Sequence, residues 1–164
     1  MTLRRRIVFV VILLLALPIV SLAVLSATSQ RLSSLGVREG RLAPCPASPN
    51  CVSTQAEDDA HRIAPIVYRS SKEDALRGLK SVLASWPRVT IVSEGPDYLH
   101  AEFRSVVFRF VDDVEFFIAP GERVIHFRSA SRVGHSDLGV NRRRMELIRE
   151  QFTEAAAATI PSGQ

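Results

Sequence analysis

Residues that could do chemistry lie in two neighbouring stretches of opposite charge. Residues 94–122 hold seven carboxylates and two arginines, whereas residues 123–149 hold seven arginines and two carboxylates. Adjacent segments of opposite charge predict that the two stretches neutralise each other. They could form a structural ion-pair network, or they could leave arginines free to bind an anion beside the N-terminus of the following helix.

The candidate ligand-binding residues come from these stretches. They are Asp112, Asp113, Glu115, His126, Arg128, Ser129, Ser131, Arg132, Asp137, Asn141 and Arg142. Side chains that alternate along a strand do not converge on a metal ion without a bulge, and no nucleophile elbow surrounds the serines. We therefore assign no catalytic residue, metal ligand or cofactor, and favour a binding module over an enzyme.

An envelope enzyme, either a hydrolase or a metal-dependent enzyme, remains the alternative interpretation of the same residues. Its site would combine acidic side chains with nearby imidazoles, which are suited to general acid–base chemistry or to metal binding. The residues of that site would be Asp112, Asp113, Glu115, His126 and His135.

A hairpin is predicted to bring the two stretches together. Residues 119–122 place Pro and Gly in type II turn positions. Pairing Ile118 with Arg123 puts apolar side chains on one face of the hairpin and polar side chains on the other. We expect the polar face to be solvent-exposed and its cross-strand pairs to add little stability. That register predicts the pairs Phe116 with Ile125, Val114 with Phe127, Glu115 with His126, and Asp113 with Arg128.

Asp112 shares the strand phase of the apolar residues and should face the core, unless a bulge turns it outward. A buried carboxylate has to be paired or neutral. We expect Asp112 to be far more sensitive to substitution than Asp113 or Glu115. Its predicted partner is Arg128, Arg132 or Arg142.

Hydrophobic periodicity predicts two helices and a set of strands. A capping box from Ser71 to Asp74 begins one helix, and an apolar stripe of Met145, Ile148 and Phe152 marks the other. The fold class is α+β, a two-layer sandwich with an antiparallel sheet of four to five strands and two helices on one face. Strands are predicted at residues 66–68, 89–92, 98–104, 107–118 and 123–129.

The N-terminus carries an export or membrane segment. Arg4, Arg5 and Arg6 precede residues 7–25, a run without a charge that is long enough to span a bilayer. We favour an uncleaved transmembrane anchor over a signal peptide cleaved near Ala23. Positive-inside orientation predicts a single-pass inner-membrane protein whose C-terminal domain lies in the periplasm or outside the cell.

Four regions follow from this organisation. They are a transmembrane signal-anchor or signal peptide at 1–25, a linker at 26–41, a globular α+β domain at 42–158 and a disordered tail at 159–164.

The net charge of +4 does not indicate a nucleic-acid-binding protein. Three of the 21 basic residues precede the apolar run, which leaves 18 against 17 acidic residues in the rest of the chain. A nearly neutral domain gains little from counterion release on a phosphate backbone. The partners expected are the membrane, through residues 7–25, and an anionic small molecule or an envelope protein.

Cys45 and Cys51 are the only cysteines. Two close cysteines in an exported domain are typical of a disulfide, which would fix a Pro-rich segment. Metal binding is the weaker alternative because two thiols do not fill a tetrahedral site, and the Cys-x-x-Cys spacing of redox motifs is absent.

Four ordered motifs carry a resemblance to a known family. They are Cys45-Pro-Ala-Ser-Pro-Asn-Cys51-Val-Ser, Phe110-Val-Asp-Asp-Val-Glu-Phe116, Arg128-Ser-Ala-Ser-Arg-Val-Gly134 and Ser136-Asp-Leu-Gly-Val-Asn-Arg142. The stretch from Leu42 to Phe152 resembles the bacterial and plastid family catalogued as domain of unknown function 1499. The resemblance implies a small domain associated with the cell envelope or an organelle, and it assigns no catalytic residues.

Overall fold

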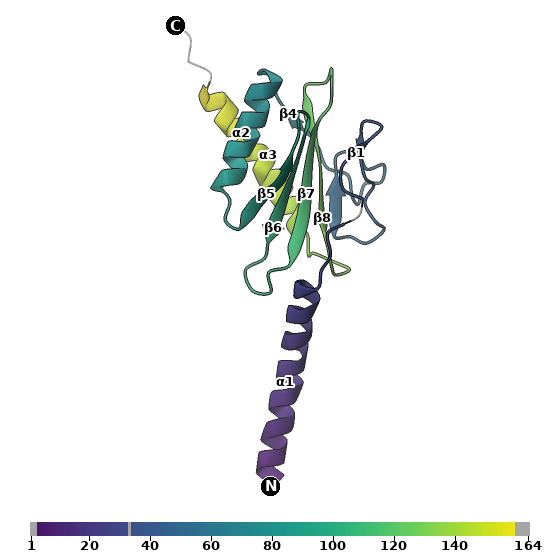
Figure 1. Cartoon of the computed structure of the whole chain (residues 1–164), viewed down its shortest axis with the longest axis vertical. Coiled ribbons are helices and arrows are strands. Elements are labelled where there is room, and N and C mark those ends of the chain that lie inside the picture. Colours follow the sequence, from purple (N-terminus) through teal and green to yellow (C-terminus); the bar gives the residue numbers. More distant parts are fainter. Residues whose placement is uncertain (1–2, 33, 160–164) are drawn as a thin grey trace.

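The computed structural model describes residues 3–32 and 34–159 of the chain. A long apolar helix, α1 (Leu3–Ala27), projects away from a domain in which a sheet packs against two helices (Figure 1). The sheet has six strands. The predicted α+β class is confirmed, with one strand more than the four or five expected.

Two further strands, β1 and β2, pair with each other outside the main sheet. They are β1 (Val37–Arg38) and β2 (Arg41–Leu42). The main sheet contains β3 (Cys51–Ser53), β4 (Ile66–Val67), β5 (Val89–Glu94), β6 (Tyr98–Arg104), β7 (Val111–Ile118) and β8 (Val124–Ser131). Its strands lie in the order β3-β8-β7-β6-β5, and β4 also pairs with β8.

The helices α2 (Lys72–Ser85) and α3 (Val140–Thr159) cover one face of the sheet (Figure 1). The backbone N–H of Asp74 donates to the Ser71 hydroxyl at 3.1 Å, so the predicted capping box begins α2. The helices and strands enclose one large apolar core. From α3 it contains Met145, Ile148 and Phe152, as their spacing predicts.

The β7–β8 register differs from the predicted one by two residues. Glu115 pairs with Arg128 rather than His126, and Ile118 pairs with Ile125. Arg123 does not pair with Ile118 because the segment after β4 holds it, with the backbone N–H of Tyr68 donating to its carbonyl at 3.0 Å. A shift of two residues preserves which side chains share a face.

The first strand of this hairpin also begins later than predicted. It starts at Val111, and residues 105–110 form the turn between β6 and β7. The predicted polar face remains polar, but it is not solvent-exposed. Asp113 and Glu115 are both 0% exposed.

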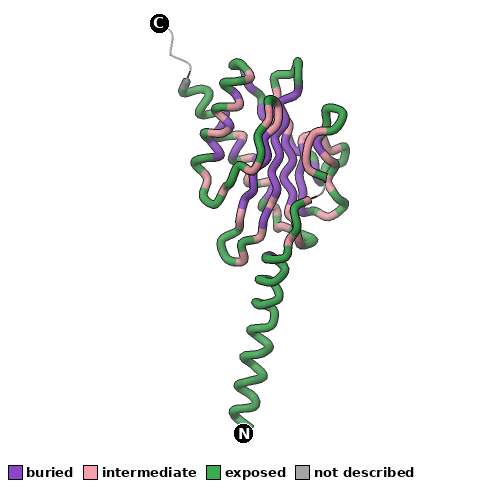
Figure 2. Tube along the Cα trace, viewed as in Figure 1, coloured by how far each residue is buried: buried purple, intermediate pink, exposed green. Residues whose placement is uncertain are grey.

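We name Arg31 and residues 34–42 the strap. The strap crosses the polar face of the sheet, opposite the face that α2 and α3 cover, and buries it. Leu42 packs on Phe117 in a second apolar cluster, and the backbone N–H of Gly36 donates to Glu115 at 2.6 Å. Figure 2 shows the central strands as buried along most of their length. The predicted linker at 26–41 therefore contributes contacts to the sheet.

α1 is, within the described residues, the one helix long and apolar enough to cross a membrane. A signal sequence near an N-terminus has the same properties. Its side chains are almost all exposed, which agrees with a segment that packs on no other part of the chain (Figure 2).

Candidate functional site

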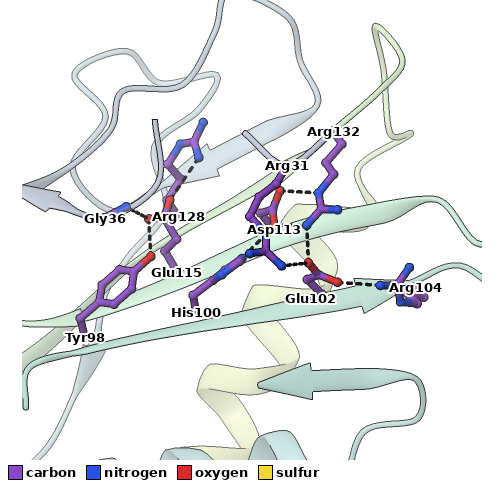
Figure 3. A network of polar contacts seen from close by, with 10 residues as sticks. All are labelled: Arg31, Gly36, Tyr98, His100, Glu102, Arg104, Asp113, Glu115, Arg128 and Arg132. Atoms are coloured by element: carbon purple, nitrogen blue, oxygen red, sulfur yellow. Dashed lines mark hydrogen bonds and ion pairs between the residues drawn. The ribbon is translucent and has the colours of Figure 1, made fainter. Parts of the chain in front are cut away.

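Asp113 lies at the centre of a buried polar network beneath the strap (Figure 3). Arg132 donates to it at two points, Nε to Oδ2 and Nη2 to Oδ1, both at 2.8 Å. His100 Nε2 lies 2.8 Å from the same Oδ1. Burial alone would raise the pKa of Asp113, but the hydrogen bonds from Arg132 and His100 lower it to about 2.

Glu102 extends the network along β6. Its carboxylate accepts from Arg132, from Arg104 at 2.7 Å and from Arg31 of the strap at 3.0 Å. Burial raises the pKa of Glu102, yet the hydrogen bonds from Arg132 and Arg31 lower it below its usual value. Glu102 therefore stays ionised and is a fixed anchor for the start of the strap.

Glu115 is held from three directions. Its Oε1 accepts from the Gly36 backbone N–H at 2.6 Å and from the Tyr98 hydroxyl at 2.8 Å, and its Oε2 accepts from Arg128 at 3.2 Å. Burial and then the negative charge of Glu115 raise the pKa of the Tyr98 phenol above its usual range. Among the described residues, Arg128 Nε is the one buried side-chain polar atom without a partner.

Every carboxylate of this network has a positively charged partner within the protein. Three carboxylates meet four guanidinium groups and one imidazole, and the labelled side chains of Figure 3 point toward one another. Arginines that are already bonded to buried carboxylates are poorly placed to recognise an external anion. Of the two interpretations of these residues, the arrangement therefore favours a structural ion-pair network over a site in which free arginines bind an anion.

Asp112 belongs to a different cluster on the helix-facing side of the sheet. Its carboxylate accepts from Arg144 at 2.6 Å, and the Arg144 guanidinium lies 4.7 Å from the centre of the Phe103 ring. The predicted partners Arg128, Arg132 and Arg142 were wrong. Arg144 reaches Asp112 because the first turns of α3 cross the end of β7 and β8 where Asp112 lies.

Asn141 connects the end of β8 to α3. Its side-chain amide donates to the Asn50 carbonyl at 3.0 Å and to the Ser131 hydroxyl at 3.1 Å, and its Oδ1 accepts from Ser129. Asn141 and Ser129 are fully buried. These side chains hold the loop before β3 against the helix, and the seryl hydroxyl is not free to act as a nucleophile.

The N-terminus of α3 is capped from within the chain. The Asp137 carboxylate accepts the backbone N–H groups of Gly139 at 2.9 Å and Asn141 at 2.6 Å. Arg142 donates to the carbonyls of Arg62 and Ala60. The helix N-terminus that the anion-binding alternative would use is therefore occupied by a carboxylate of the protein itself.

The two candidate imidazoles lie apart. His126 contacts the Thr54 hydroxyl at 3.0 Å and Glu122 at 3.3 Å, beside β3. His135 is exposed in the loop before α3. In residues 3–32 and 34–159, no group of three His, Cys, Asp or Glu is close enough to hold a metal ion.

A hollow of about 620 Å³ lies beside the strap. It is lined from segments 34–45 and 53–58, and its charged residues are Arg38, Arg41, Glu57 and Asp58. The Cys45–Cys51 disulfide, predicted from the sequence, fixes one wall of it. Gln55 fixes another, because its side-chain amide bonds the backbone of Leu42 and Gly40.

A family model described as protein of unknown function (DUF1499) matches residues 41–152. The chain belongs to this family. No curated protein matches the sequence. The DUF1499 region contains the carboxylates of the network and their partners on β6, on β8 and just after β8, and it begins after Arg31 and Gly36. The contacts that tie α1 to the sheet therefore come from outside the matched region.

The network includes residues that our reading of the sequence missed. Tyr98, His100 and Glu102 alternate with apolar residues along β6, and this period-2 pattern was a usable signal. Arg31 and Gly36 carry no such signal, because their partners lie 71 and 79 residues away in the chain.

Proposed function

We propose that this protein is a single-pass membrane protein whose exported domain acts as a binding or assembly module of the cell envelope. Three arginines precede α1, which favours insertion with the N-terminus in the cytoplasm. A disulfide in the domain is consistent with an oxidising compartment on the other side.

The observation that carries the binding role is the contrast between two groups of arginines. Arg128 and Arg132 are bonded to buried carboxylates, and Arg144 is bonded to the partly buried Asp112. Arg38 and Arg41 are exposed and line the hollow beside the strap. The contact surface that we propose is therefore this hollow and not the Arg-rich loop.

The chemistry of the hollow favours a polypeptide over a small anion. Its wall combines both signs of charge with the apolar residues Leu42, Ala43 and Pro44. A segment of an envelope protein carries matching features, whereas a small anion would be repelled by Glu57 and Asp58.

Two measurements test the proposal. A reporter active only outside the cytoplasm is fused after Gln164, and activity is expected. A photoreactive side chain is then introduced in cells at Arg38, with Glu150 on α3 as an exposed control.

We expect the photoreactive side chain at position 38 to form one crosslinked adduct, and we expect Arg41→Glu to abolish it. When the partner protein is tagged instead, purification of the partner should yield the same adduct. The same adducts at both positions, or none at position 38, would contradict binding in the hollow. Reporter activity in the cytoplasm would contradict the topology.

A further inference from the structure

The most exposed large apolar side chains of the domain lie at one end of the sheet. They are Leu138 (82% exposed), Val107 (76%) and Val106 (70%). Val106 and Val107 lie in the β6–β7 turn, and Leu138 lies in the loop between β8 and α3. The antiparallel pairs Arg104 with Val111 and Asp112 with Ser131 place both loops at the same end of the sheet.

That end of the sheet is also the one tied to α1. Arg31 follows the last residue of α1, Ala27, by four residues, so its Cα lies within about 14 Å of the helix end. Its guanidinium bonds Glu102, which is two residues from the end of β6. Figure 1 shows both loops directed toward the side from which α1 leaves the domain.

The composition of the two loops suits a membrane interface. The β6–β7 turn, residues 105–110, contains no acidic residue and carries one arginine, Arg109. Phe108 and Phe110 are half-buried with ring centres 5.8 Å apart, beside the two exposed valines. Apolar and aromatic side chains flanked by arginine are typical of segments that enter the headgroup region.

The backbone holds Leu138 outward against its own preference. Its φ angle is 55°, in the left-handed region that side chains with a Cβ rarely adopt. The carboxylate of Asp137 and the hydroxyl of Ser136 hold the turn on either side of it. An apolar side chain that is held exposed by a strained backbone favours a contact outside the domain.

We propose that these two loops form a second membrane contact, in which Val106, Val107 and Leu138 enter the lipid surface beside the exit of α1. The inference rests on the proposed topology, in which α1 crosses the bilayer. The occupant is the lipid leaflet on the exported side, because the loops are held next to the only apolar helix of the described residues. The domain would then have a fixed orientation relative to the membrane rather than a freely changing one.

The test uses the full chain reconstituted in vesicles of phosphatidylethanolamine with a minority of phosphatidylglycerol. An environment-sensitive fluorophore is attached through Val107→Cys or Leu138→Cys. The matched control is Val67→Cys, an exposed valine that pairs with the start of β8 at the opposite end of the sheet.

Lipids with a nitroxide near the headgroup are expected to quench positions 107 and 138 at least about twofold more than position 67, since interfacial side chains enter roughly 5–10 Å. Equal quenching at the three positions would overturn the proposal. A blue shift without nitroxide quenching that grows with protein density would also overturn it, because a second copy would then cover the loops.

Alkaline extraction of the same vesicles separates this inference from the proposed topology. If the chain stays in the membrane and the loops are not quenched, only the second contact is wrong. If the chain is extracted, the transmembrane anchor is wrong as well.

Discussion

Asp113 on β7 and Arg132, the residue after β8, form a buried two-point ion pair with both nitrogen–oxygen distances at 2.8 Å. The pair joins the two stretches of opposite charge in the sequence. It lies beneath the strap, so the segment that follows α1 covers this ion pair.

Removing Asp113 should cost more than removing Asp112, which reverses the order expected from the sequence because Asp113 is the more deeply buried of the two. Asp113→Ala leaves Arg132 and His100 without their shared buried partner, and we expect a loss of about 3–5 kcal/mol in the free energy of unfolding. Asp112→Ala leaves Arg144 its contacts with Asn141 and the Phe103 ring, so about 1.5–3 kcal/mol is expected. Denaturant melts of the full chain in detergent measure both. The reverse order would mean that the strap opens in solution.

Acid should weaken the domain through Asp113. Its pKa is lowered to about 2 in the folded protein from the usual 3.8, so its stabilising contribution is complete above about pH 4 and is lost as the pH falls through about 2. We expect a loss of about 2 kcal/mol over this window, as the shift implies. Melts between pH 5 and pH 2 measure it, with Asp113→Asn as the control that lacks this component. Identical pH profiles for the two proteins would refute the assignment.

Gly36→Ala should loosen the strap. Gly36 has φ 106°, and a Cβ there meets no atom within 4 Å, so the cost comes from the backbone alone. We expect a loss of more than about 1 kcal/mol and faster hydrogen exchange at the Gly36 amide that binds Glu115. Gly95→Ala is the matched control, because a Cβ there makes an ordinary contact at 3.9 Å without a positive φ. Equal effects of the two substitutions would argue against the strap.

Reduction of the Cys45–Cys51 disulfide should destabilise the hollow. The two cysteines are six positions apart, and chain entropy for so short a loop gives about 2 kcal/mol. Melts with and without reductant measure the loss, and the double variant Cys45→Ser, Cys51→Ser should be insensitive to reductant. Thiol labelling of both cysteines in protein kept unreduced would contradict an oxidised pair.

The sequence predicted the elements and faces better than it predicted exposure. The capping box at Ser71 and the apolar stripe through Met145 depend on neighbouring residues, and both helices were found. The phase of β7 was also right, because alternation is a local property. The prediction that Asp113 and Glu115 are solvent-exposed was wrong, because their exposure depends on whether a segment distant in the sequence covers that face of the sheet.

The candidate site shows the same limit. Opposite charges in adjacent stretches predicted an ion-pair network, but its pairs are not the predicted ones. Asp112 bonds Arg144 instead of a residue in the preceding loop, because the pairing is set by where α3 crosses the sheet. Glu115 bonds Arg128 because a two-residue shift in the hairpin changes partners without changing faces.

The strap has a consequence for secretion. On the proposed topology the domain that follows α1 is exported beginning at its N-terminal end. Arg31 and Gly36 then emerge long before Glu102 and Glu115, their partners 71 and 79 residues later. The cysteine pair is local and is able to oxidise early, whereas the strap has to wait for β6 and β7 to be translocated. The segment nearest the membrane is thus the first part of the domain to be exported and among the last to fold. Until it docks, the nascent domain exposes the polar face of its sheet, on which Glu102 and Glu115 each lack one bond.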